Sequence, residues 1–88
     1  MNDKWYVVNT HINKEEIAFS NMINQGFEVY TPRYDKIVRH ARSVKHISAP
    51  LFPRYLFVKF DINKPNWVKI RSTKGVNKLI NEFSNFII

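Results

Sequence analysis

The stretch YLFVKF, residues 55–60, is the strongest strand pattern in the chain, because β-branched and aromatic side chains favour an extended backbone. Successive side chains of a strand point to opposite faces, so Leu56, Val58 and Phe60 share one face. Tyr55 and Phe57 share the other face. A face that met only water would be polar, and this one carries two aromatic rings. The stretch predicts a sheet whose second face is a docking or stacking surface, unless the hairpin or the C-terminal segment folds over it.

The segments around this strand predict a β-α-β-hairpin-β-α-β order. Residues 5–10 carry apolar side chains on both alternating faces, which is typical of an interior strand. A helix is expected from an N-cap at Asn13, where Glu16 completes a capping box, to a stop at Gly26. The remaining expected elements are a strand over 27–31, hairpin arms over 34–39 and 43–48, a second helix that begins at Asn63 or Asn66 and ends by Gly75, and a strand over 76–80.

Two helices in so short a chain cover only one face of a sheet. The predicted fold class is therefore α+β: an antiparallel sheet of about four strands, with helices on one face and a protruding basic β-hairpin. A chain of 88 residues has room for a single domain, here 1–88, and 44% apolar residues place it among globular proteins.

The composition also limits the chemistry and the setting of the protein. The chain has no cysteine, which removes disulfides, thiolate nucleophiles and cysteine-based zinc sites. No apolar run reaches the roughly 18 residues that span a bilayer. We expect a soluble, cytoplasmic monomer with no membrane partner.

Positive charge is concentrated in the predicted hairpin. The whole chain has a net charge of +7, and residues 33–45 hold five lysines and arginines against one aspartate. Such an arm is suited to contact the phosphates of a nucleic acid, with Lys36, Arg39 and Arg42 as candidate contacts. The alternative is a sheet edge that lysine and arginine keep soluble.

The sequence contains no recognisable catalytic, cofactor-binding or metal-binding motif. His11, His40 and His46 lack the spacing of a metal site and have no carboxylate pair beside them. The aspartates are scattered, and two glycines cannot build a phosphate-cradling loop. We therefore expect a protein that is not an enzyme and that holds no cofactor or metal.

Three motifs stand in order along the chain: Trp-Tyr at 5–6, Phe-Pro-x-Tyr-x-Phe-Val at 52–58, and Arg-Ser-Thr-x-Gly-Val at 71–76. Together they resemble the N-terminal (NGN) domain of the NusG family of transcription elongation factors, which has an RRM-like arrangement. The segments KIVR at 36–39 and PLFP at 50–53 are closer to the RfaH-like specialised antitermination paralogues. Housekeeping NusG usually carries a glycine where Arg54 stands.

This resemblance implies a factor that docks on the clamp helices of the largest subunit of bacterial RNA polymerase and bridges the cleft to the opposite pincer. Holding the clamp closed suppresses pausing without making or breaking a bond. Tyr55 and Phe57 match the docking positions of the family, with Phe52 and Val7 as neighbours. Trp67 is interpreted as a core residue and not as a contact.

The RfaH-like branch also reads bases of the non-template DNA strand in the transcription bubble, through its first helix and the loop before the Gly-Val pair. The matching positions in this chain are His11, Asn21, Asn24, Gln25 and Lys74. Three of them are amides where that branch tends to carry charged or imidazole groups. Asparagine and glutamine also read base edges, so the resemblance implies a different specificity.

Two other functions stay open at this point. The aromatic face suits an RRM-like module in which Tyr55 and Phe57 stack on the bases of single-stranded RNA. A small nuclease would instead depend on His11, His40 or His46. The chain also ends before the KOW domain that follows in family members, either because it is a short natural form or because the boundary cuts a larger domain.

Overall fold

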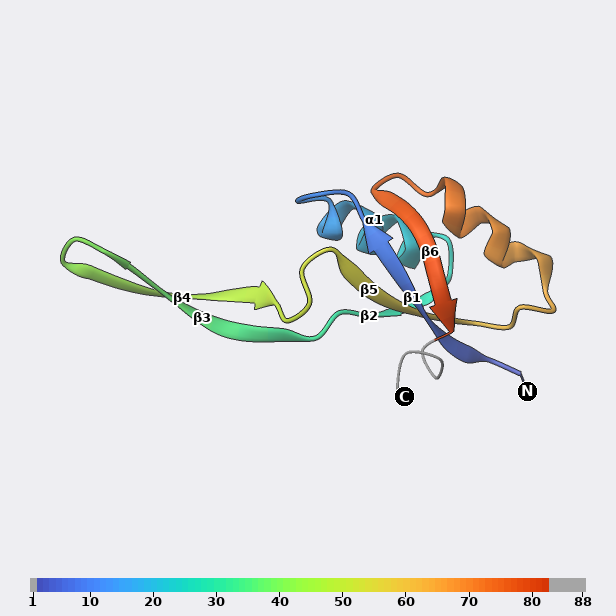
Figure 1. Cartoon of the computed structure of the whole chain (residues 1–88), viewed down its shortest axis with the longest axis horizontal. Coiled ribbons are helices and arrows are strands. Elements are labelled where there is room, and N and C mark those ends of the chain that lie inside the picture. The colour runs from blue at the N-terminus through green and yellow to red at the C-terminus, as the bar shows by residue number, and fades with distance from the viewer. Residues whose placement is uncertain (1, 83–88) are drawn as a thin grey trace.

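The computed structural model describes residues 2–82, which form a four-stranded antiparallel sheet, two helices and a separate two-stranded hairpin (Figure 1). This arrangement confirms the predicted α+β class and the predicted order of elements. The elements in chain order are β1 (Lys4–Thr10), α1 (Glu15–Asn24), β2 (Glu28–Tyr30), β3 (Arg33–His40), β4 (Ser43–Pro50), β5 (Tyr55–Phe60), the 3₁₀ helix η1 (Pro65–Ser72) and β6 (Val76–Glu82).

The main sheet has the strand order β2-β5-β1-β6, so β1 lies between two neighbours, as its two-sided apolar pattern predicts. β5 pairs with β1 on one side and with β2 on the other, and both pairings are antiparallel. Phe57 stands opposite Val7 of β1 and opposite Tyr30 of β2. Directly opposed residues of an antiparallel pair share a face, so these three side chains lie on the same side of the sheet.

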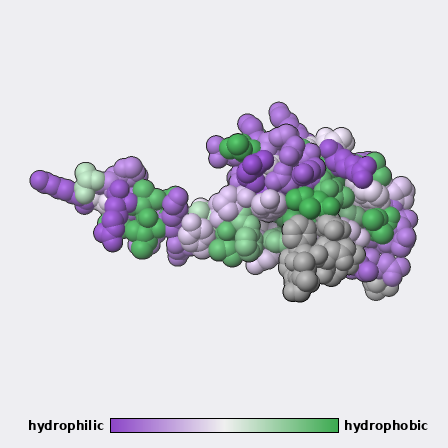
Figure 2. All heavy atoms as spheres, in the orientation of Figure 1, coloured by the Kyte–Doolittle hydropathy of each residue, from purple (hydrophilic) through white to green (hydrophobic). Residues whose placement is uncertain are grey.

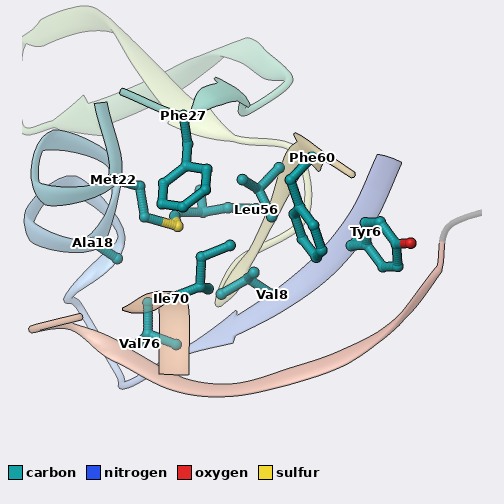
Figure 3. Close-up of a cluster of buried hydrophobic side chains, with 10 residues drawn as sticks. Tyr6, Val8, Ala18, Met22, Phe27, Leu56, Phe60, Ile70 and Val76 are labelled. Atoms are coloured by element: carbon teal, nitrogen blue, oxygen red, sulfur yellow. The ribbon is translucent and has the colours of Figure 1, made fainter. Parts of the chain in front are cut away.

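The hydrophobic core lies between the other face of the sheet and the two helices (Figure 3). Leu56, Val58 and Val8 are fully buried on the strands, and they meet Met22 of α1 and Ile70 of η1. Burying a large aliphatic side chain stabilises a fold by about 1.5–3 kcal/mol. In a chain without disulfides, this single layer of side chains supplies most of the stability of the domain.

The start of α1 differs from the sequence prediction. Asn13 does not cap the helix: its backbone has a φ of 60°, the N-cap is Lys14, and no side chain caps the first turn. The Glu16 carboxylate, expected to close a capping box, instead accepts a hydrogen bond from Arg33 at 3.2 Å. An ion pair with the base of the hairpin has replaced the local cap. The predicted stop is confirmed, since Gly26 follows the C-cap Gln25 with a φ of 92°.

The second helix is a 3₁₀ helix, whose period of three residues places Trp67 and Ile70 on one row. Ile70 is completely buried, and the Trp67 ring stacks on Phe60 with 5.8 Å between ring centroids. The Trp67 indole N–H donates to the carbonyl of Ile62 at 2.9 Å. Trp67 is therefore a packing residue beside the core, as predicted.

The hairpin β3–β4 projects from the body, and the described chain measures 54 × 30 × 19 Å along its principal axes (Figure 1). Its arms are longer than predicted, and a two-residue turn joins His40 to Ser43. Arg33 stabilises the base of the hairpin through hydrogen bonds to β4 and to α1. Its guanidinium donates to the hydroxyl and the carbonyl of Ser48 on β4, at 2.8 and 3.0 Å, besides its bond to Glu16 of α1.

Candidate functional site

An apolar groove lies on the face of the sheet opposite the helices. The central strands β1 and β5 contribute to it, together with the end of β2 and the loop between β4 and β5. Its volume is about 670 Å³. The lining side chains are all apolar or aromatic: Trp5, Val7, Tyr30, Pro32, Phe52, Tyr55 and Phe57.

The groove has a floor and a rim. Val7 is only 4% exposed and forms part of the floor, and Phe57 is half-buried. Phe52 and Tyr55 are exposed at 47% and 39%. Phe57 packs edge-on against Phe52 at 6.2 Å and against the tilted ring of Tyr30 at 6.4 Å between centroids. The contacts with Phe57 restrict the Phe52 and Tyr30 rings, so these two side chains lose little conformational entropy when a partner covers them.

All four residues that the sequence analysis proposes for docking therefore lie in one groove: Tyr55, Phe57, Phe52 and Val7. Trp5, Tyr30 and Pro32 also line the groove and were not predicted from the sequence. Alternation along residues 5–10 places Trp5 on the same face as Val7, and this signal was available from the sequence. Tyr30 needed the register of β2 on β5, which pairs it with Phe57.

The predicted DNA-reading residues of the body gather at the end of β1 beside the loop that precedes β6. The His11 backbone N–H donates to the carbonyl of Gly75 at 3.0 Å. The Asn21 side chain donates to the carbonyl of Lys74 at 3.3 Å, and Gln25 donates to the Thr73 hydroxyl at 2.9 Å. Asn24 ends α1 and is exposed. The structure thus brings His11, Asn21 and Lys74 together, with Gln25 and Asn24 further along the same helix.

The other three predicted nucleic-acid contacts, Lys36, Arg39 and Arg42, lie on the hairpin, apart from that group (Figure 1). They are exposed, and Arg42 is in the turn. Figure 2 shows apolar atoms among the hydrophilic ones on the hairpin. The exposed apolar residues there are Tyr34, Ile37, Val44 and Ile47.

A second basic region was not recognised from the sequence. Residues 62–81 contain four lysines and one arginine, and no aspartate or glutamate. Only one of these cations, a lysine, lies within β6. All five cations are exposed: Lys64, Lys69, Arg71, Lys74 and Lys78. Arg71 lies over the Trp67 ring, with 5.3 Å between its guanidinium carbon and the ring centroid, which limits its freedom. A count of charged residues over 62–81 could have revealed this region from the sequence. The sequence prediction considered only the charge of the hairpin.

The histidines are not assembled into a reactive site within residues 2–82. His40 and His46 lie on the hairpin and point to its opposite faces according to the register, whereas His11 lies on the body. Over the same described range, no three histidine, aspartate or glutamate side chains are grouped to hold a metal ion. None of the helices in this part of the chain is long and apolar enough to cross a membrane.

Comparison with known protein families gives a match that spans nearly the whole chain. The family model described as the transcription termination factor NusG matches residues 3–87. The chain belongs to the NusG family. The match includes all four sheet strands of the body, the hairpin and the groove.

Membership in the NusG family assigns the chain a role in transcription elongation or termination. NusG is a family of transcription factors, and neither the RNA-binding module nor the nuclease of the sequence analysis is favoured by this match. The aromatic groove and the basic hairpin are exposed features of this NusG domain. The possibility that the C-terminal segment covers the groove concerns residues 83–88, which lie outside the described residues.

Proposed function

We propose that this NusG-family domain is a transcription elongation factor that docks through the groove on the clamp helices of the largest subunit of bacterial RNA polymerase. The observation that supports this most is the groove itself, in which aromatic rings line the helix-free face of the sheet. Phe52 and Tyr55 expose their rings at the rim. A hydrophobic ridge, such as one formed by helices, fits an open groove of this kind.

The rings are suited to supply the binding energy. Buried aromatic anchors at the centre of an interface are frequently worth about 2 kcal/mol or more each in an alanine test. Phe52 and Tyr30 already pack against Phe57, so the groove is formed before the partner arrives. Preorganisation of this kind leaves more of the contact energy available for affinity.

The group at the end of β1 and the hairpin extend the proposal to nucleic acid. With the groove on the clamp, His11, Asn21 and Lys74 contact the non-template strand, and Lys36, Arg39 and Arg42 on the hairpin contact phosphates further along. The domain thereby bridges the cleft. Because the closed clamp is the state that it binds, it shifts the enzyme away from open, paused conformations and suppresses pausing.

An RfaH-like specialisation forms part of this proposal. A bidentate contact to adenine uses both the donor and the acceptor of an amide. Asn21 donates one amide hydrogen to the Lys74 carbonyl and Gln25 donates one to the Thr73 hydroxyl, so neither amide can rotate onto a base without losing that bond. Asn24 has no partner among the described residues and is therefore the amide best placed to read a base edge.

Crosslinking to a reconstituted elongation complex tests the proposed function. A photoreactive amino acid replaces Phe52 in one protein and Asn24 in another, and the crosslinked peptides and nucleotides are mapped. We expect position 52 to label the clamp helices and position 24 to label the non-template strand. Labelling of RNA alone by both positions contradicts the proposal and supports an RNA-binding module.

Phosphate contacts by the hairpin would make the affinity for nucleic acid depend on salt concentration. Replacing Arg39 and Arg42 with glutamine is expected to weaken binding to nucleic acid within the elongation complex. It should also reduce the slope of log affinity against log salt concentration by about 0.7–0.9 for each lost phosphate contact. The measurement is a titration at several salt concentrations.

The matched control replaces Lys64 and Lys69 with glutamine, two exposed cations beside and within η1 and apart from the hairpin, so that the net charge changes equally. A slope that falls as much in the control as in the hairpin variant indicates diffuse attraction. That result contradicts a positioned hairpin.

A further inference from the structure

Arg54 has a backbone conformation that normally favours glycine. Its φ is 72°, in the left-handed region, where a side chain other than that of glycine is costly. Among residues 2–82, Asn13 and Ala41 are the other non-glycine residues with positive φ. Asparagine tolerates this region, and Ala41 is in a two-residue hairpin turn of the kind that requires it. Arg54 is neither an asparagine nor part of such a turn.

Three hydrogen bonds hold the backbone of residue 54 in this conformation. Its N–H donates to the Glu15 carboxylate at 3.0 Å. Its carbonyl accepts from the Thr10 backbone N–H at 2.8 Å and from the Asn9 side chain at 3.1 Å. Every one of these bonds uses backbone atoms of residue 54, so a glycine would form them equally well.

The Arg54 side chain contributes little to this arrangement. Its Nε lies 3.4 Å from the Thr10 carbonyl, which is long for a hydrogen bond. Its two terminal nitrogens have no partner among the described residues, and the residue is exposed. Two or more N–H donors are therefore free to bind an anion bidentately. Oε2 of the Glu15 carboxylate accepts the hydrogen bond of the Arg54 backbone N–H, and among the described residues no ion pair joins this carboxylate to the guanidinium.

The position of Arg54 connects the two surfaces that the proposed function uses. On one side it directly precedes Tyr55 at the rim of the groove. On the other, Thr10 and His11 of β1 bond in succession to Arg54 and Gly75. With neighbouring strands about 4.8 Å apart, residues 54 and 75 flank the end of β1 at about 10 Å from each other.

We propose that Arg54 binds a backbone phosphate of the single-stranded nucleic acid that passes His11 and Lys74, at the edge of the polymerase-docking groove. This inference rests on the proposed function and assigns that function a further binding residue. In this proposal the contact between the guanidinium and the phosphate offsets the cost of an arginine in a left-handed backbone conformation. Arg54 thereby connects docking and nucleic-acid binding across the end of one strand.

Replacement of Arg54 by glycine, alanine and lysine tests the inference. The backbone conformation favours glycine at this position, whereas binding of a phosphate favours arginine. Arg54→Gly relieves the backbone and removes the cation, so we expect a urea midpoint no lower than that of the wild type. Its affinity for a fluorescent single-stranded DNA should fall about tenfold, with a salt slope reduced by about 0.7. Arg54→Ala should lose the same affinity, and Arg54→Lys should keep most of it.

Two results overturn the inference. One is wild-type affinity and slope in Arg54→Gly. The other is a lower urea midpoint in that variant, which shows that the arginine is needed for folding. Wild-type protein that binds neither the DNA nor the elongation complex contradicts the proposed function instead. A variant that docks normally on the polymerase but binds the DNA weakly supports the role of Arg54 separately from docking.

Discussion

Replacing Tyr55 and Phe57 with alanine is expected to lower the affinity of the domain for a transcription elongation complex by about 1000-fold. Each ring is an aromatic anchor worth about 2 kcal/mol, and about 1.4 kcal/mol changes affinity tenfold. Phe57 also supports Phe52 and Tyr30, so its removal should disturb the rest of the groove as well. A binding titration against the labelled elongation complex gives the affinity, and circular dichroism reports whether the fold is retained.

Two further variants make this result interpretable. Phe57 is half-buried, so the double variant Phe52→Ala with Tyr55→Ala removes only rim side chains that are 47% and 39% exposed. The matched control is Ile23→Ala with Val68→Ala, which removes two exposed apolar side chains from the two helices. Wild-type affinity in the rim variant, or an equal loss in the control, is incompatible with docking through the groove.

Replacing Gly75 with alanine is expected to destabilise the domain by about 2–4 kcal/mol, from a left-handed backbone conformation and from steric overlap together. Gly75 has a φ of 95°, and a Cβ atom there would lie 2.8 Å from the backbone nitrogen of Ala18 and 3.0 Å from the carbonyl oxygen of Lys14. Both atoms belong to the helix backbone and cannot rotate away. Urea denaturation measures the free energy of unfolding.

Gly26 is the matched control for Gly75. Its φ of 92° is nearly the same, and a Cβ atom there would have no neighbour within 4 Å. Gly26→Ala should therefore cost only the conformational part, about 1–2 kcal/mol. Equal losses in the two variants contradict a close approach of the β6 loop to α1, since the overlap distinguishes the two sites.

Gly75 also affects the group of side chains that is proposed to contact DNA. This glycine lets the loop approach α1 closely, so that Asn21 bonds to the Lys74 carbonyl and His11 bonds to Gly75. A variant that stays folded but separates the loop from the helix should disperse these side chains. Its affinity for single-stranded DNA should then fall, whereas the groove on the opposite face keeps its affinity for polymerase.

Several features of the fold were predictable from short segments alone. The β5 strand begins and ends at the predicted residues, and its inner side chains Leu56, Val58 and Phe60 are buried as alternation requires. Gly26 ends α1, and the hairpin turn lies at residues 41 and 42. Three of the four docking candidates, Val7, Tyr55 and Phe57, lie on strands, where alternation places them on the face that carries the groove. Phe52 lies in the loop before β5.

The errors concern contacts between residues that are distant in the sequence. Asn13 and Glu16 have the spacing of a capping box, but the Glu16 carboxylate bonds to Arg33, seventeen residues further on. A local motif cannot show that a stronger partner for the carboxylate, a guanidinium at the base of the hairpin, will be nearby. The strain at Arg54 was equally invisible, because φ at that residue is determined by bonds to β1 and α1.

The amino-acid sequence by itself determined which segments are strands and helices and which strand carries aromatic side chains on both faces, because these properties depend on side-chain periodicity within a few residues. Only the tertiary structure decided that Tyr30 joins Phe57 in the groove, that Gly75 allows a loop to contact α1, and that Arg54 stands between the groove and the loop that precedes β6. These features depend on strand register and on the close approach of backbones, which involve residues far apart in the chain. Tyr30 pairs with Phe57 across 27 residues, and Asn77 donates a hydrogen bond to Asn9 across 68 residues.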